Sequence, residues 1–448
     1  MIRDIGRCGL VGLGLCTVLS LTACGSSPLP PPPPAPSTSA EADPAVADQQ
    51  IPDAFDKARG WKAEDHGTGL ERPVVAARSG LVLFTKSLND GRIRVLAKDM
   101  RTGATRWTSR PLKLPDTGQN YHSVSTSLFG TTKNGKEYAV LAAPGTEGGD
   151  TVNKPKEVTT LQIFDVADMR DQGTPARVVT VPESAQEFIP QNDGNLLVRL
   201  GSSTAVVDVS SGRDTGYRHQ DAALHAPKAC DYEIGDCNQG ITVSGMTPKG
   251  PLVQGFGAFW VPGGWFSGDV PPPGVHPGSG LEEEVRAIGT PDGRSVVAAW
   301  PGANDSSDDR VWAVHDAATG KVEASVPCAQ SDLDDSGSGR RGVPVLSGDG
   351  RYLIAGEVVF DLAAKKGICL AENESREAVT VSAVDRDGTG YGTAGSSQAT
   401  EGAVRVSVAT GKATALPEGT KAPTEITGPV AVFDEESDGV FVYPRKPR

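Results

Sequence analysis

Short apolar runs separated by polar turns repeat along most of this chain. From about residue 72 onward, runs rich in Val, Ala and Leu alternate with turn pairs such as Asn-Gly and Asp-Gly, and no long segment keeps an apolar period of 3.6 residues. Strands joined by hairpins produce this pattern, whereas amphipathic helices would show the longer period. We therefore predict an all-β chain.

Two kinds of turn recur in this region. The first is a pair ending in Gly, spaced at 38 to 59 residues. Its copies are Ser79-Gly80, Asn134-Gly135, Asp193-Gly194, Lys249-Gly250, Asp292-Gly293, Asp349-Gly350, Asp387-Gly388 and Asp438-Gly439. The second, D-x-x-[ST]-G, occurs at 99–103, 208–212 and 316–320, with a variant at 407–411 and looser copies beginning at Asp165 and Asp361. The Asp carboxylate of this pattern can accept hydrogen bonds from turn amides, and Gly permits positive φ, so we expect it to join strands.

The clearest repeat contains four apolar runs, at 285–288, 295–300, 311–315 and 322–326. Four-stranded units repeating at such intervals predict a β-propeller, in which each small sheet buries both faces against its neighbours. Seven units fit between residues 73 and 417. Two further strands near 428–443 and a segment at 55–64 can complete an eighth blade shared between the two ends of the chain. Eight blades are the preferred prediction and seven the alternative.

The turn at 99–103 is followed by Trp107, and this full motif resembles that of pyrroloquinoline-quinone-like (quinoprotein-like) propellers. Ala324 and Ala415 stand at the equivalent positions of other repeats, while the turns at 291–294 and 348–351 are similar to those of WD40-like and TolB-like propellers. The resemblance spans about residues 72–445 and implies the fold. The dehydrogenases of the family have an adjacent cysteine pair or a metal-ligand set that this sequence lacks, so we expect no cofactor.

The N-terminus has the pattern of a bacterial lipoprotein signal peptide. Arg3 and Arg7 precede an apolar stretch, and Leu21-Thr22-Ala23 leads directly to Cys24. We predict a signal peptide over residues 1–23, cleavage before Cys24, and diacylglycerol on its thiol. Residues 24–50 are rich in Pro, Ser and Ala and would form a solvated tether. Residues 51–448 would form the propeller domain.

The formal charge is −13, and removal of residues 1–23 makes it −14. Because an acidic chain is repelled by phosphate backbones and by anionic headgroups, we expect no nucleic-acid binding and attachment to the membrane only through the lipid anchor. The Ala, Gly, Pro and Asp content suits a GC-rich actinobacterium. The expected location is therefore the extracytoplasmic face of the cell membrane, with the inner leaflet of an outer membrane as the alternative.

Four further cysteines lie in the predicted domain, and an exported protein can oxidise them. Three pairings are possible. We favour Cys230 with Cys237, which closes a short loop, and therefore Cys328 with Cys369. A zinc site is disfavoured because no C-x-x-C pair or histidine array accompanies them.

No catalytic constellation stands out. The G-x-G-x-x-G at 390–395 is not followed by a helical pattern, and the acidic clusters at 332–335 and 385–387 lack the closing Glu of a calcium loop. We predict no metal and no catalytic residue. Trp260 and Trp265 flank a Pro-Gly-Gly loop and are the candidate ligand contacts, because an exposed aromatic pair could hold a sugar or anchor a protein. The interpretation that we favour over this one is that they plug the interface between blades or the central channel.

These observations predict a lipid-anchored, non-catalytic propeller that acts as a scaffold for an envelope protein. A glycan-binding or small-ligand module is the alternative, and a propeller enzyme such as a quinoprotein dehydrogenase is the third class considered.

Overall fold

A computed structural model describes residues 49–63, 73–116, 126–168, 173–191, 193–227, 231–232, 235–275, 285–302, 310–329, 344–395, 402–435 and 439–447. These residues form antiparallel strands and three 3-10 helices: η1 (Lys57–Arg59), η2 (Ala222–Leu224) and η3 (Ser267–Asp269). The all-β prediction is confirmed.

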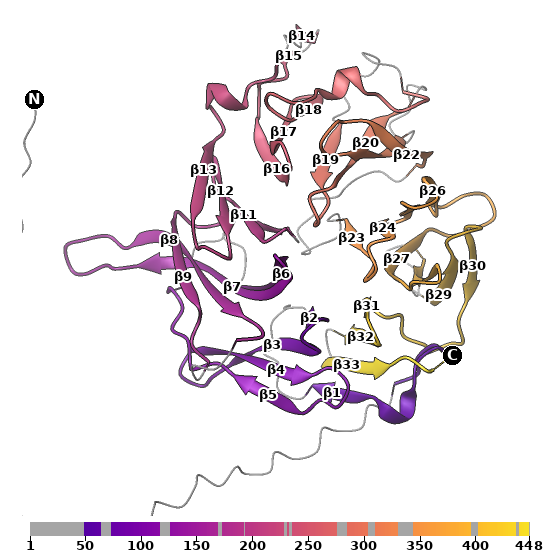
Figure 1. The fold of residues 1–448 in the computed structure, drawn as a ribbon, viewed down its shortest axis with the longest axis horizontal. Helices are drawn as coiled ribbons and strands as arrows, with labels where there is room; N and C mark the ends of the chain where they lie inside the picture. Colours follow the sequence, from indigo (N-terminus) through magenta and orange to yellow (C-terminus); the bar gives the residue numbers. More distant parts are fainter. Residues whose placement is uncertain are drawn as a thin grey trace, which may run out of the picture. The chain divides into compact units, whose positions relative to one another are not determined.

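The strands form eight small sheets arranged in a ring (Figure 1). Blades 1 to 3 follow the chain order. They consist of β2 (Val74–Ala76), β3 (Leu81–Ser87), β4 (Ile93–Asp99) and β5 (Thr105–Thr108); β6 (Ser127–Lys133), β7 (Lys136–Glu147), β8 (Lys156–Asp165) and β9 (Arg177–Pro182); and β10 (Glu187–Pro190), β11 (Asn195–Arg199), β12 (Ser203–Asp208) and β13 (Asp214–Arg218). Each blade runs from an innermost to an outermost strand.

Blade 4 has three strands, β16 (Thr242–Thr247), β17 (Gly250–Gly255) and β18 (Ala258–Trp260), and a two-stranded hairpin, β14 (Asp231–Tyr232) and β15 (Gly235–Asp236), precedes it. Blades 5 to 7 again have four. They consist of β19 (Arg286–Gly289), β20 (Ser295–Pro301), β21 (Arg310–Asp316) and β22 (Val322–Pro327); β23 (Val345–Leu346), β24 (Tyr352–Ala355), β25 (Val358–Asp361) and β26 (Lys366–Cys369); and β27 (Val379–Val384), β28 (Thr389–Ala394), β29 (Gly402–Ser407) and β30 (Lys412–Ala415).

Blade 8 closes the ring with both ends of the described chain. It contains β31 (Glu425–Thr427), β32 (Val430–Glu435) and β33 (Gly439–Pro444), and β1 (Trp61–Ala63) pairs with β33 as the outermost strand. The predicted eight blades and the blade shared between the termini are therefore both confirmed. This arrangement satisfies a strand edge that would otherwise stay open.

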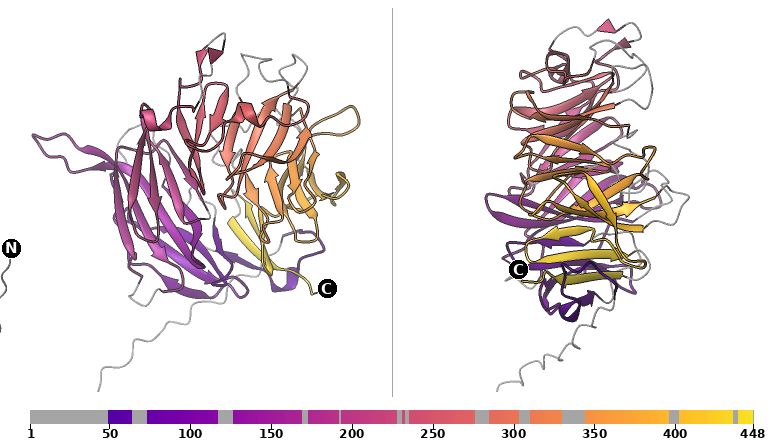
Figure 2. Two further views of the ribbon diagram at one scale, coloured as in Figure 1. Left: turned by 45° about the horizontal axis from the view of Figure 1, so that its top comes forward. Right: turned by 90° about the vertical axis from the view of Figure 1, so that its right-hand side faces the viewer.

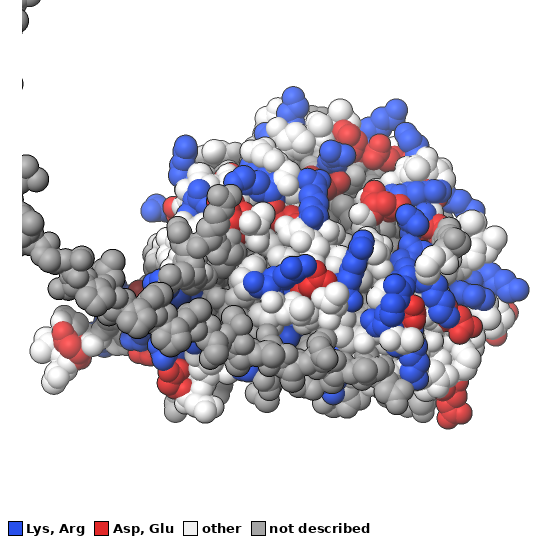
Figure 3. Space-filling view, turned by 60° about the horizontal axis from the view of Figure 1, so that its bottom comes forward, with Lys and Arg blue, Asp and Glu red and all other residues white. Residues whose placement is uncertain are grey.

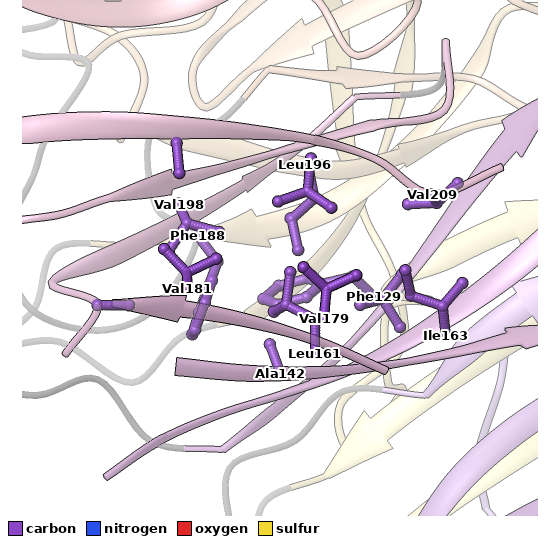
Figure 4. Close-up of a cluster of buried hydrophobic side chains, with 14 of the residues drawn as sticks. Phe129, Ala142, Leu161, Ile163, Val179, Val181, Phe188, Leu196, Val198 and Val209 are labelled. Atoms are coloured by element: carbon purple, nitrogen blue, oxygen red, sulfur yellow. The ribbon is translucent and has the colours of Figure 1, made fainter. Parts of the chain in front are cut away.

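The core lies between the blades. Each of eight clusters of buried apolar side chains joins two consecutive blades, and the last joins blade 8 to blade 1. Figure 4 shows the cluster between blades 2 and 3, where Leu161 and Val179 meet Phe188 and Leu196. Burial of one such side chain contributes roughly 1.5–3 kcal/mol. The clusters are what hold the ring together.

Burial on both faces explains the unbroken apolar runs in the sequence. In β20, Val296 and Ala298 belong to the cluster shared with blade 4, while Val297 and Ala299 belong to the cluster shared with blade 6. Successive strand residues point to opposite faces, so a strand that is covered on both sides has no polar alternation.

The two predicted turn types occupy different places in a blade. The first type joins the innermost strand to the second in blades 1 to 7, and the second type joins the third strand to the outermost one. In the turn at 99–103, the Asp99 carboxylate accepts from the backbone N–H groups of Arg101 and Thr102 at 3.0 Å, and Gly103 has a φ of 71°. Blade 8 differs, because Gly439 lies between its second and third strands.

Candidate functional site

The prediction that Trp260 and Trp265 form an exposed contact pair is wrong for this structure. Their side chains are 0% and 8% exposed, and both belong to clusters between blades. The segment 261–264 is a tight turn, in which the N–H of Gly264 donates to the carbonyl oxygen of Val261 at 2.8 Å. Residues 265–266 therefore run back beside Trp260 and take the place of the missing outermost strand of blade 4.

Trp265 docks onto the next blade. Its indole N–H donates to the carbonyl oxygen of Ala317 at 3.0 Å, and its ring stacks on His315 with the planes 9° apart. A Cβ on Gly320 would lie 2.5 Å from the indole, so only glycine fits at this turn position. Burial lowers the pKa of His315 to about 4, which keeps the ring neutral near pH 7. The aromatic segment has a structural role here.

The disulfide prediction is confirmed for one pair. Cys328, just after the outermost strand of blade 5, is bonded to Cys369 at the end of the outermost strand of blade 6. Cys237 is also disulfide-bonded. Its predicted partner Cys230 and the predicted lipidation site Cys24 lie outside the described residues.

A groove opens where the chain passes from blade 3 to blade 4. Its volume is about 460 Å³. The groove is lined by Ser202, His219, Gln220, His225, Asn238, Gly240, Ile241 and Thr242. Most of these residues come from the connection between β13 and β16. The repeat pattern does not cover this connection, so the groove has no signal in the sequence.

The polar groups of the groove are partly fixed by neighbours. The Asn238 side-chain oxygen accepts from the N–H of Ala226 at 2.8 Å, and the His219 Nε2 lies 3.3 Å from the Thr204 hydroxyl. Burial, assisted by the charge of Arg199, lowers the pKa of His219. A neutral imidazole in this position can exchange hydrogen bonds with a polar ligand.

A second surface feature is the hairpin of β7 and β8. Since β9 pairs with β8 only over residues 158–163, the outer part of this hairpin is a two-stranded ribbon. It reaches beyond the other strands at the left of Figure 1 and of the left panel of Figure 2. Val152 at its tip is 89% exposed, and Val178 on β9 is 61% exposed. Blade 2 therefore carries two of the three large hydrophobic side chains that are exposed in the described residues.

Within the described residues, no three His, Cys, Asp or Glu side chains converge as a metal ion would require. Among the helices of these same segments, none is long and apolar enough to cross a bilayer.

The closed ring of eight small sheets defines the chain as an eight-bladed β-propeller. Its sequence matches no known protein family and no curated protein. Among solved structures it is similar to the propeller of Dos1, with 11% identity, a TM-score of 0.42, and coverage of 88% of this chain and 95% of that one.

Two peptidases show a comparable likeness. The dipeptidyl peptidase 4 of Porphyromonas gingivalis is 9% identical with a TM-score of 0.42, over 83% of this chain and 57% of that one. The acylaminoacyl peptidase of Pyrococcus horikoshii is 12% identical with a TM-score of 0.35, over 77% of this chain and 44% of that one. The chain thus spans less than two thirds of either peptidase. No activity is inferred from likenesses this distant.

Proposed function

We propose that this chain is an exported lipoprotein, anchored through Cys24 at the extracytoplasmic face of the cell membrane, whose propeller binds a partner protein and performs no chemistry of its own. The sequence at 21–24 supports the anchor. The start of the described chain supports a tethered arrangement, because the Gln49 N–H donates to the Tyr443 hydroxyl at 3.1 Å and the Gln50 carbonyl accepts from Lys421 at 2.9 Å. The tether therefore joins the ring at blade 8.

The main support for a scaffold role is the projecting β7–β8 hairpin with its exposed apolar tip. An exposed valine at the tip of a projecting ribbon gains apolar burial when it enters a pocket on another protein, and Val178 adds a second apolar contact on the same blade. The ribbon also places backbone donors and acceptors away from the ring. A projecting ribbon with an exposed apolar tip can therefore dock onto a partner by burying that side chain.

Anchoring is tested by Cys24→Ser. We expect the variant to leave the membrane fraction, while mass spectrometry of the wild-type chain should find an acylated cysteine at its N-terminus. An unmodified N-terminus upstream of Cys24 would contradict the anchor.

Docking is tested with a photo-crosslinking residue in place of Asn153, beside the hairpin tip, and with a matched residue in place of Lys321 on blade 5. We expect a discrete crosslinked product in cells only from position 153, and its loss when Val152→Asp is added. Products of equal yield from both positions, or a product that Val152→Asp leaves unchanged, would contradict docking by the hairpin.

The groove between blades 3 and 4 supports a second candidate function, the binding of a small polar ligand. If it binds sugars, a panel of mono- and disaccharides should include a member that raises the melting temperature of the wild-type protein and not that of His219→Ala. A uniform lack of response, or an equal shift in both proteins, would remove this candidate.

A further inference from the structure

The charge of this acidic protein is distributed unevenly around the ring. Residues 49–116 carry thirteen Lys and Arg against eight Asp and Glu, a surplus of five positive charges. Since the whole chain has a formal charge of −13, the remaining residues together carry −18. The net charge of the chain therefore hides a basic region formed by the N-terminal segment and blade 1.

Much of this positive charge lies on the outermost strands of blades 8 and 1 and on the segments that flank them. We name this surface the basic rim. It consists of Lys57, Arg59, Lys62, Arg101, Arg106, Arg110, Lys113 and Lys446. Figure 3 shows the molecule from the side of β1 and β5, where Lys and Arg side chains outnumber acidic ones. All rim residues except Lys62, which is half-buried, are exposed.

Within the described residues of these segments, acidic side chains are fewer than basic ones. Four of them are described, Asp53, Asp56, Asp99 and Asp116. Asp56 pairs with Arg59 at 2.6 Å, and Asp99 pairs with Arg106 at 2.7 Å. The described part of the rim therefore keeps a net positive charge.

The tether joins the ring at this same surface. The backbone N–H of Lys446 donates to the carbonyl oxygen of Ala54 at 2.9 Å, so the first described residues run directly beside the rim. Between Cys24 and Gln49 lie only 24 residues, which span at most roughly 85 Å when fully extended. The anchor would thus keep the rim within roughly 85 Å of the bilayer.

We propose that the basic rim docks the propeller onto anionic lipid headgroups of the membrane that holds its anchor. The choice of a lipid surface as the polyanion rests on the proposed anchoring through Cys24. Each Lys or Arg near an anionic surface strengthens adsorption roughly fivefold, and the attraction extends over a Debye length of about 8 Å at physiological salt. The acidic remainder of the ring is repelled, so the propeller stands on the rim of blades 8 and 1 and turns the opposite blades outward.

The test uses the mature chain with Cys24→Ser, so that no acyl chain contributes. Cosedimentation measures its binding to vesicles of phosphatidylcholine alone and to vesicles that also contain phosphatidylglycerol. We expect binding to the anionic vesicles only. Three of the exposed rim residues are then neutralised together as Arg101→Gln, Lys113→Gln and Lys446→Gln, which should weaken binding on the order of a hundredfold. Equal binding to both vesicle types, or undiminished binding of this triple variant, would overturn the proposal.

The matched control removes the same charge from the other side of the ring. Lys249→Gln, Lys321→Gln and Lys366→Gln alter exposed residues of blades 4, 5 and 6 and should leave vesicle binding unchanged. If the control variant loses as much vesicle binding as the rim variant, the loss comes from the change in net charge and the proposed docking surface is wrong. The proposal would also be overturned if the rim binds soluble polyphosphate and anionic vesicles fail to displace it. The ligand would then be a free polyanion.

The outcome is separable from that of the proposed anchoring. Vesicle binding is measured without the acyl chains, whereas anchoring is read from the membrane fraction of the wild-type chain in cells. Vesicle binding without anchoring contradicts only the anchor, and anchoring without vesicle binding contradicts only the rim.

Discussion

Trp61 is the residue on which closure of the ring depends most directly. It lies on β1, the strand that the N-terminal segment adds to blade 8, and its side chain is 2% exposed between blades 8 and 1. The indole N–H donates to the carbonyl oxygen of Met100 at 3.1 Å, and the ring meets Phe84 edge-on at 6.2 Å. The informative perturbation is Trp61→Ala.

The expected loss can be worked from these contacts. Truncation of a buried tryptophan costs about 3–5 kcal/mol, which includes the cavity left behind. The Met100 carbonyl also loses its indole donor, at a cost of about 1 kcal/mol or more when no water replaces it. β1 is only three residues long, and the segment before it is held by the buried Phe55 and by the Asp56 N–H, which donates to the Pro444 carbonyl oxygen at 2.7 Å. We expect the free energy of unfolding to fall by about 4–6 kcal/mol, together with release of β1 from β33.

Urea unfolding followed by far-ultraviolet circular dichroism measures the loss of stability. Limited proteolysis tests strand release, because residues ahead of Ala63 should become cleavable under native conditions. The matched control is Trp107→Ala on β5, a half-buried tryptophan that stacks on Phe164 at 6.3 Å and should cost about 2 kcal/mol. A Trp61→Ala protein that loses no more than this control, or stays resistant to proteolysis, would refute the account of closure.

Three further predictions concern buried polar groups and the disulfide. The pKa of buried His315 is about 4, below the ordinary 6.5, so the unfolded chain protonates first, and stability should fall by roughly 3 kcal/mol between pH 6.5 and pH 4. Urea midpoints measured against pH should show this slope in the wild type and not in His315→Gln. Arg445→Met removes the cation beside the Asp385 carboxylate, which is 4% exposed, and should lower the free energy of unfolding by about 3–5 kcal/mol. Adding Asp385→Asn to the same chain should restore much of this loss. Denaturant titration of the single and the double variant tests both expectations. Cys328→Ser with Cys369→Ser opens a link across 41 residues and should cost about 4 kcal/mol, measurable as a lower melting temperature than that of the wild type without reductant.

The fold was predictable because its determinants are local and repeated. Every blade is specified by short apolar runs, and turn chemistry marks where strands reverse, as in Asp316, whose carboxylate accepts from the Thr319 N–H at 2.8 Å. The shared blade was also predictable by counting strands. The two strands near 428–443 do not make a complete blade, and the segment at 55–64 can supply a further strand. Such features need no knowledge of which distant residues meet.

The candidate site was not predictable in the same way. The aromatic segment was expected to be exposed because Pro262 and the two glycines after it interrupt the strand pattern. In the structure those residues form the turn itself, and the flanking aromatics alternate between the two faces of blade 4: Phe259 and Trp265 face blade 5, whereas Trp260 and Phe266 face blade 3. The groove and the basic rim are formed by segments that meet only in the closed ring. The negative net charge of the whole chain gives no sign of the rim, because the positive residues of the rim are outnumbered elsewhere.

Trp61 and Trp265 make the same contact from unrelated sequence contexts. Each occupies the outermost position of its blade, and each donates its indole N–H to the carbonyl oxygen just after the turn aspartate of the next blade, at Met100 and Ala317. The motif with Trp four residues after Gly is thus one of several routes to a docking tryptophan, and its degradation in the repeats does not mean that docking is lost.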